Sequence, residues 1–330
     1  MNKRRKVIVA LGASALTSPL ASLAQQKPAR VSRIGLLSPF SAADATPSHN
    51  AFRAGLRDLG WVEGRIMVIE SRFAEGKTDQ LPRLAAELVR SKVDVIVTST
   101  TPAALAAKHA TTTVPIVIGF VADPIGSGIV ASLARPGGNI TGWTHSGREL
   151  RAKYLELLKD AVPSATRFGV LWNPANQVHQ PSMQNIEDAA RQLKVELHLA
   201  GAREPKELER AVSGLMEKRI QALVVFPDGM FQSQTSQIVA LAARHRLPAV
   251  YGLREFAEAG GLMAYGANVA TMHRQLSASL VDKILKGARP ASLPVAQPTQ
   301  FDLLINLKTA KALGLTIPPA LLVRADQLIE

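Results

Sequence analysis

The sequence predicts an α/β protein with two doubly wound parallel-sheet lobes joined by a multi-strand hinge. Its 330 residues are too many for one ordinary core and suit about two domains. Short apolar runs rich in Val, Ile and Leu alternate with segments of helical periodicity, as they do in parallel sheets covered by helices. The same alternation occurs a second time along the chain, which predicts two similar lobes in tandem.

The first lobe is predicted from a β-α-β-α-β-α-β alternation. We expect the first helix to begin at Thr46, with Pro47 at its first position, and a later helix to begin at Thr101-Pro102. Apolar residues recur at helical spacing in between. The strands are expected at residues 34–37, 66–71, 93–98 and 114–120. This order predicts a parallel, doubly wound sheet.

Three strand-like segments of the first half are echoed later in the same order. They are Arg-Ile-Gly-Leu-Leu at 33–37 and Arg-Phe-Gly-Val-Leu at 167–171, Val-Asp-Val-Ile-Val at 93–97 and Ile-Gln-Ala-Leu-Val-Val at 220–225, and Val-Pro-Ile-Val-Ile-Gly at 114–119 and Leu-Pro-Ala-Val-Tyr-Gly at 247–252. The period exceeds 100 residues, which is too long for a solenoid repeat. The echo therefore predicts a second lobe of the same kind.

The domain boundaries follow from Gly- and Pro-rich segments. The chain is expected to cross between lobes at residues 135–142 and again near 251–261, followed by a strand at 262–266, a helix at 271–285 and a strand at 301–306. The predicted organisation is a signal peptide at 1–24, a first lobe at 31–140 plus about 252–270, and a second lobe at 141–251 plus about 271–330. Two lobes joined by several chain segments can rotate about a hinge but cannot separate from each other.

The N-terminus has the pattern of a secretory signal peptide. A basic cluster at residues 3–6 precedes an apolar run at 7–16, and small residues precede a cleavage site near Ala24. This run of ten residues, broken by a Gly and a Ser, is short of the about 20 that span a bilayer. We therefore expect the mature protein in the periplasm, exported by the general or the twin-arginine route. The alternative is a buried N-terminal helix.

Composition excludes several classes of function. The chain has no Cys, which rules out disulfides, thiolate metal sites and a lipid-modified N-terminal Cys. The formal net charge of +13 raises nucleic acid as a partner, but the charges are spread along the chain and no nucleic-acid-binding motif is present. We expect a solvated basic surface and no nucleic-acid partner.

The sequence carries no recognisable catalytic or metal signature. None of the seven His residues has metal-binding spacing, and the nucleophile elbow, Walker and dinucleotide fingerprints are absent. Asp123 and Asp228 each follow a predicted strand, but nothing shows that they meet as the paired carboxylates of a hydrolase. We expect no catalytic residue, no metal and no cofactor, with a secreted α/β hydrolase as the lesser alternative.

Candidate binding residues cluster after the predicted strands, where open α/β sheets bind ligands. In the first lobe they are Ser38, Ser41, Ser99, Thr100, Thr101, Ala103, Phe120 and Asp123, and in the second they are Trp172, Asn173, Asn176, Asp228 and Tyr251. A helix N-terminus beside hydroxyls suits a carboxylate, and Asp228 suits an amine. Together they would bind a zwitterion with an apolar side group. Each also has a plain structural reading, because Thr101 suits a helix cap and Asp228-Gly229 a turn.

Three motifs carry a resemblance to a known family. They are Asp-Pro-Ile-Gly-Ser-Gly-Ile-Val at 123–130, Pro-Gly-Gly-Asn-Ile-Thr-Gly at 136–142, and Asn-Leu-Lys-Thr-Ala-Lys-Ala-Leu-Gly-Leu-Thr-Ile-Pro at 306–318. With these motifs the chain resembles the ABC-transporter substrate-binding family, which includes tryptophan/tyrosine-type binding proteins, over roughly residues 32–320. The resemblance implies a type I periplasmic-binding-protein fold and no catalysis.

The resemblance also implies a function and a site. The expected role is the periplasmic solute-binding component of an ABC importer, a monomer that closes around an aromatic or branched-chain amino acid or related small carboxylate and delivers it to a membrane permease. The alternatives are the binding subunit of a periplasmic sensor and a repressor effector domain, and the signal peptide is evidence against the repressor.

The resemblance also implies roles for individual residues. By position, Thr100, Thr101 and Ala103 resemble the carboxylate site, and Asp228 resembles the partner of the amine. Asn139, Thr141 and Gly142 resemble a crossover motif beside the cleft. Many relatives carry Gly where Thr100 stands, so this chain adds a methyl and a hydroxyl group there.

Overall fold

The first sheet has five parallel strands in the order β2-β1-β3-β4-β5. The computed structural model describes residues 31–145, 148–176 and 179–330, so the predicted signal peptide lies outside the described residues. The strands are β1 (Ser32–Ser38), β2 (Met67–Phe73), β3 (Val95–Ser99), β4 (Ile116–Val121) and β5 (Ile140–Thr144). All six residues of β4 are buried, because helices cover both faces of the sheet.

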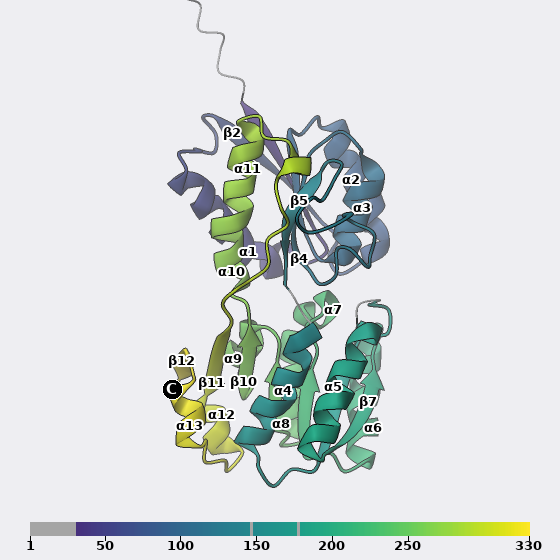
Figure 1. Ribbon diagram of the computed structural model, residues 1–330, viewed down its shortest axis with the longest axis vertical. Coiled ribbons are helices and arrows are strands. Elements are labelled where there is room, and N and C mark those ends of the chain that lie inside the picture. Colours follow the sequence, from purple (N-terminus) through teal and green to yellow (C-terminus); the bar gives the residue numbers. More distant parts are fainter. Residues whose placement is uncertain (1–30, 146–147, 177–178) are drawn as a thin grey trace, which may run out of the picture. The chain divides into compact units, whose positions relative to one another are not determined.

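The two faces of the first sheet are covered by helices from different parts of the chain (Figure 1). Helices α2 (Leu81–Arg90) and α3 (Thr101–Ala110) pack on one face. The other carries α1 (Ala42–Asp58) and, from far along the chain, α10 (Val269–Met272), a π-helical turn (His273–Ser277) and α11 (Ala278–Leu285). A methyl group on Gly55 would lie 2.0 Å from the carbonyl oxygen of Arg274, so only Gly permits this close packing.

The second sheet has seven strands in the order β12-β11-β10-β9-β8-β6-β7. They are β6 (Arg167–Trp172), β7 (Glu196–Gly201), β8 (Ala222–Val225), β9 (Ala249–Tyr251), β10 (Met263–Gly266), β11 (Asp302–Asn306) and β12 (Gln327–Ile329). Among the described strands every pairing is parallel except that of β10 with β11. The two doubly wound sheets confirm the predicted fold class.

Helices cover both faces of the second sheet as well (Figure 1). On one face lie α4 (Arg148–Ala161), α5 (His179–Leu193), α12 (Leu307–Ala312) and α13 (Pro319–Val323). On the other lie α6 (Leu208–Glu217), α8 (Thr235–Arg244) and α9 (Arg254–Glu258). The short helix α7 (Gly229–Ser233) follows β8. Within the part of the chain that the structure describes, no helix combines the length and the apolar character that a membrane span needs.

The crossings between the sheets differ from those predicted. Residues 140–142 do not cross, because they belong to β5, which pairs with β4. Strand β10 pairs with β9 and β11 of the second sheet, whereas 269–285 pack on α1 of the first, the reverse of the predicted assignment. The physical reason is burial: Ala278 and Val281 cover an apolar face that α1 leaves open. The chain crosses after β5, between β10 and α10, and between α11 and β11 (Figure 1).

Helix α1 begins one turn before the predicted start. Ser41 is its N-cap, because the Ser41 hydroxyl accepts a hydrogen bond from the Asp44 N–H (3.2 Å) and donates one to Asp44 Oδ2 (2.7 Å). Thr46, the predicted cap, lies inside the helix and donates to the carbonyl of Ala42 (2.7 Å). The prediction at Thr46 was wrong because the Ser41–Asp44 pair satisfies the free N–H groups one turn earlier.

Candidate functional site

A cavity of about 640 Å³ lies at the carboxyl ends of strands from both sheets. This volume is within the usual range of ligand sites, about 300–1,000 Å³. Segments after β1, β3 and β4 line it from the first sheet, and segments after β6 and β8 line it from the second. Because the carboxyl ends of parallel strands meet at one edge of a sheet, each lobe contributes a cluster of loop residues.

The structure brings seven of the predicted site residues to this cavity. They are Thr100, Thr101, Phe120, Asp123, Asn173, Asn176 and Asp228. Phe120 stacks on His145, with 4.5 Å between the ring centroids. The two acids Asp123 and Asp228 therefore line one cavity, a point that the sequence left open. Asp123 accepts a hydrogen bond from the Gly126 N–H (2.8 Å).

Other predicted site residues have structural positions away from the cavity. Ser41 caps α1, and Ala103 is buried in the core beneath α3. Asn139 donates to the carbonyls of Val114 (2.7 Å) and Thr111 (3.2 Å), and Thr141 donates to that of Leu293 (2.7 Å). These residues hold loops and a crossing segment against the first sheet, so the structure does not place them where a ligand would lie.

The remaining predicted residues divide between the core and a second, smaller space. Trp172 packs against the core on the α4 and α5 side of the second sheet. Tyr251 is fully buried, stacks on Phe256 at 4.7 Å, and has a pKa raised by burial. Ser38 and Ser99 line a small chamber beside the main cavity, and the Ser38 hydroxyl accepts from the Phe40 N–H (3.1 Å).

Several cavity residues were not among the predicted set. Phe40 follows β1, and His145 follows β5. Lys77 lies after β2 and Arg203 lies after β7, each beyond the carboxyl end of its strand. The loops after these two strands contributed no residue to the site predicted from the sequence. Applying the same strand-end rule to β2, β5 and β7 would have found three of these four residues.

Asp228 is held in place by four N–H donors. It caps α7, where Oδ1 accepts from the backbone N–H of Met230 (2.9 Å) and Phe231 (3.4 Å). Oδ1 also accepts from Asn173 Nδ2 (3.1 Å), and Oδ2 accepts from Asn176 Nδ2 (2.8 Å). A carboxylate has about four lone-pair sites over two oxygens, so Oδ2 retains capacity for one further donor.

His179 connects the two strand ends that carry Asn173 and Asp228. Its Nδ1 accepts from the Asn173 backbone N–H (3.1 Å), so the ring hydrogen is on Nε2, which donates to the carbonyl of Pro227 (3.1 Å). Burial and the charge of Arg151 lower the pKa of His179, and the imidazole is therefore neutral. Only the neutral ring can accept at one nitrogen and donate at the other.

Thr100 has a strained backbone at the edge of the cavity. Its φ of 71° and ψ of 155° lie in a region that is essentially restricted to Gly. The side chain is buried, and its hydroxyl has no hydrogen-bond partner among the described residues. A β-branched residue in this conformation keeps a buried, unpaired hydroxyl beside the cavity at a cost in stability.

Thr100→Gly is expected to raise the free energy of unfolding by about 1 kcal/mol. Relief of about 1–3 kcal/mol of backbone strain exceeds the about 0.4–1 kcal/mol lost to the greater freedom of Gly in the unfolded chain. Chemical denaturation would measure the change. Thr100→Ala is the control, because it removes the buried, unpaired hydroxyl and keeps a Cβ in the strained conformation, so the stability that Gly gains beyond Ala measures the backbone strain. An unchanged or lower stability of the Gly variant would contradict the strain.

Arg151 is a buried cation behind the second-lobe wall of the cavity. Its side chain is 1% exposed, and its guanidinium lies 4.5 Å from the ring centre of Phe226 and 5.8 Å from that of Tyr154. Within the described residues it forms no ion pair with an acid, and Nε and Nη1 have no hydrogen-bond partner. Burial, together with this charge, lowers the pKa of His145 to about 3, so the His145 ring in the cavity wall is neutral.

These features define a class of protein. Two doubly wound lobes joined by three crossings, with a cavity that both lobes line at their strand ends, are the architecture of two-lobed solute-binding proteins. Among the described residues no group of three or more potential metal ligands comes together.

The chain belongs to the ABC transporter substrate binding protein family, whose model matches residues 34–329. It is 28% identical over 264 residues to a tyrosine-binding protein of Clostridioides difficile (strain R20291), covering 80% of this chain and 75% of that protein.

Solved structures agree with the family. A conserved domain protein from Vibrio cholerae superposes with a TM-score of 0.84 at 27% identity, covering 91% of this chain and all of that one. An ABC domain from Streptococcus pneumonia in complex with L-Trp gives a TM-score of 0.83 at 25% identity, over 90% of this chain and 99% of that one. A substrate binding protein with adhesive properties from Clostridium difficile, in a ligand-free, open structure, gives a TM-score of 0.68 at 25% identity. The match covers 91% of this chain and 99% of that one. The predicted type I periplasmic-binding-protein fold is confirmed.

Proposed function

We propose that this protein binds an aromatic amino acid in the cavity between its lobes and delivers it to the membrane permease of an ABC importer. The observation that carries the proposal is the pairing of an unused hydroxyl, that of Thr100, with the anchored carboxylate of Asp228 in one cavity. The relative named for tyrosine and the neighbour solved with L-Trp support the ligand class. The signal peptide predicted at residues 1–24 supports a periplasmic location.

Each end of the zwitterion has a matching group in the cavity. Helix α3 begins at Thr101, where free backbone N–H groups and the helix dipole favour a carboxylate, and the Thr100 hydroxyl, buried at the same helix start, has no partner among the described residues. The ammonium group would donate to Asp228 Oδ2, which accepts from Asn176 Nδ2 and has room for another donor. Phe40 and Phe120 supply aromatic surface for the side chain.

L-Tryptophan, L-tyrosine and L-phenylalanine are expected to stabilise the protein in a thermal-shift assay. A ligand at a hundredfold its Kd adds about 2.7 kcal/mol by mass action. The matched controls are tyramine, which lacks the carboxylate, and 3-(4-hydroxyphenyl)propionate, which lacks the amine, and both should give smaller shifts. Absence of a shift with all three amino acids would refute the ligand class, and equal shifts with tyramine would refute the carboxylate site.

A further inference from the structure

A small polar chamber adjoins the main cavity beside Phe40 and Phe120, which line both spaces. Its volume is about 20 Å³. A polar space needs roughly 10–15 Å³ by this measure to hold one water molecule, so the chamber fits one small polar group and excludes a ring. Ser38, Asp44 and Thr98 line the chamber but already have hydrogen-bond partners nearby in the chain or on the next strand. Five further polar side chains define it: Ser48, His49, Ser99, Gln232 and His273.

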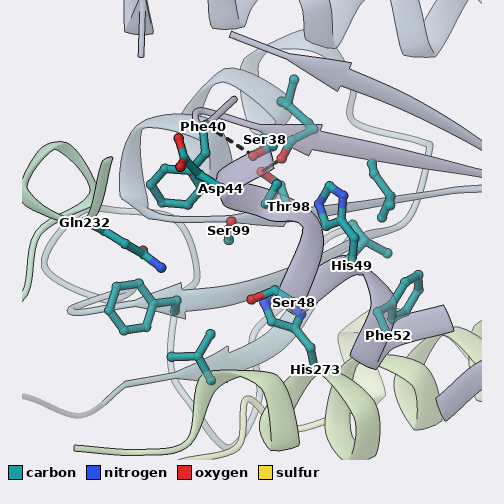
Figure 2. A pocket seen from close by; sticks show the side chains of 16 residues that line it. Ser38, Phe40, Asp44, Ser48, His49, Phe52, Thr98, Ser99, Gln232 and His273 are labelled. Atoms are coloured by element: carbon teal, nitrogen blue, oxygen red, sulfur yellow. Dashed lines mark hydrogen bonds between the residues drawn. The ribbon is translucent and has the colours of Figure 1, made fainter. Parts of the chain in front are cut away.

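These five side chains come from four separate segments of the chain (Figure 2). Ser48 and His49 are on α1, and Ser99 ends β3. His273 begins the π-helical turn, and Gln232 reaches in from α7 of the second lobe. Figure 2 shows the Gln232 amide directed toward the space between Ser99 and Ser48. The chamber is therefore completed by both lobes.

The chamber has unused hydrogen-bonding capacity. No side-chain hydrogen bond to another described residue is formed by Ser48, His49, Ser99 or Gln232. His273 uses Nδ1 for a hydrogen bond with the Ser277 hydroxyl (3.1 Å), which leaves Nε2. The one acid of the lining, Asp44, accepts from Ser41 at the start of α1. Water can reach these partly buried groups, and an occupant that both donates and accepts would pair with them in its place.

The five polar side chains favour a neutral occupant, and the carboxyl group of Asp44 is engaged by the Ser41 hydroxyl at the start of α1. Burial, reinforced by Arg53, lowers the pKa of His49 to about 4. Burial, reinforced by His49, lowers the pKa of His273 to about 3. Both imidazoles are therefore uncharged at neutral pH, and the other three side chains are neutral hydroxyls and an amide. A hydroxyl group, which donates one hydrogen bond and accepts others, matches this set.

We propose that the polar chamber receives a hydroxyl group at the far end of an aromatic ligand, so that the protein selects a hydroxyphenyl side chain over rings without a hydroxyl. This selectivity rests on the proposed binding of aromatic amino acids. The ligand ring lies against Phe40 and Phe120 in the main cavity, and its hydroxyl extends into the chamber. A ring lacking the hydroxyl leaves the chamber to a water molecule, so that ligand gains none of the hydrogen bonds that the hydroxyl of the other ligand forms with the chamber.

Calorimetric titration with L-tyrosine and L-phenylalanine tests the selectivity. The wild-type protein is expected to bind L-tyrosine at least about tenfold more tightly, as one or two hydrogen bonds provide. In Gln232→Leu and Ser48→Ala the ratio should fall below about threefold because tyrosine binding weakens while phenylalanine binding is retained. Gln237→Leu, which makes the same change at an exposed position of α8, is the control and should keep the wild-type ratio.

The outcomes separate this inference from the function on which it rests. If both amino acids bind with similar affinity to the wild-type protein, the chamber does not select a hydroxyl, although the proposed function stands. A preference for tyrosine that survives both chamber substitutions would also overturn the assignment, because another group would then contact the hydroxyl. If neither of these amino acids nor L-tryptophan binds, the proposed function fails and the selectivity fails with it.

Discussion

Asp228→Ala is expected to weaken binding of an aromatic amino acid by roughly 2–5 kcal/mol, the usual loss when one partner of a buried charge pair is removed. The ligand ammonium would lose its acceptor, and the amides of Asn173 and Asn176 would lose theirs. Calorimetric titration with L-tyrosine would measure the change. Near-wild-type affinity would refute the assignment of Asp228 to the amine.

The same substitution should also lower the free energy of unfolding, by about 1 kcal/mol, because it removes the N-cap of α7. Asp228→Asn separates the two effects, because the Asn oxygen can still cap the helix while the negative charge is gone. It should therefore retain most of the stability and lose most of the affinity. An Asn variant with wild-type affinity would show that the charge is not used.

Arg151→Met is expected to raise the free energy of unfolding by about 1–4 kcal/mol, as replacement of buried ionic groups by apolar residues often does. The guanidinium is buried between Phe226 and Tyr154 without an acidic partner among the described residues, so its desolvation is offset only in part by the two rings and by a hydrogen bond with the Tyr154 side chain. Met is flexible and fills a similar space. Chemical denaturation would measure the gain.

The matched control is Arg191→Met on α5, where an exposed Arg pairs with Asp188. This change should alter the stability by less than about 1 kcal/mol, because exposed ion pairs contribute little. If Arg151→Met destabilises the protein, the guanidinium makes a favourable interaction that outweighs its burial. Burial also remains the main cause of the low pKa of His145, so that pKa should rise only in part when Arg151 is removed.

Local patterns in the sequence predicted β1 to β4 of the first sheet and most of the second sheet, but they took the start of β5 for a connection between the lobes. The strands ending near Leu37, Ser99 and Val121 are apolar and flanked by helical periodicity, so both types of element were recognisable. The strand-end rule then located Thr100 and Asp228, because parallel strands carry their carboxyl ends to the same edge. The same rule also selected Ser41 and Ala103, but Ser41 is the N-cap of α1 and the Ala103 side chain is buried in the core. The rule predicts where a residue lies along the chain and not the direction of its side chain.

The sequence alone therefore determined the two-lobed α/β class and the edge at which a ligand would bind, because periodicity and strand order are local properties. Only the tertiary structure decided which lobe each tail segment joins, since residues 269–285 pack beside α1 on an apolar face of the first sheet that α1 leaves open, more than 200 residues earlier in the chain. It also decided the left-handed backbone of Thr100 and the polar chamber. Ser48 and His273 both line this chamber although they lie far apart in the sequence. A contact between distant segments produces no periodic pattern in a single sequence, so the sequence could not predict it.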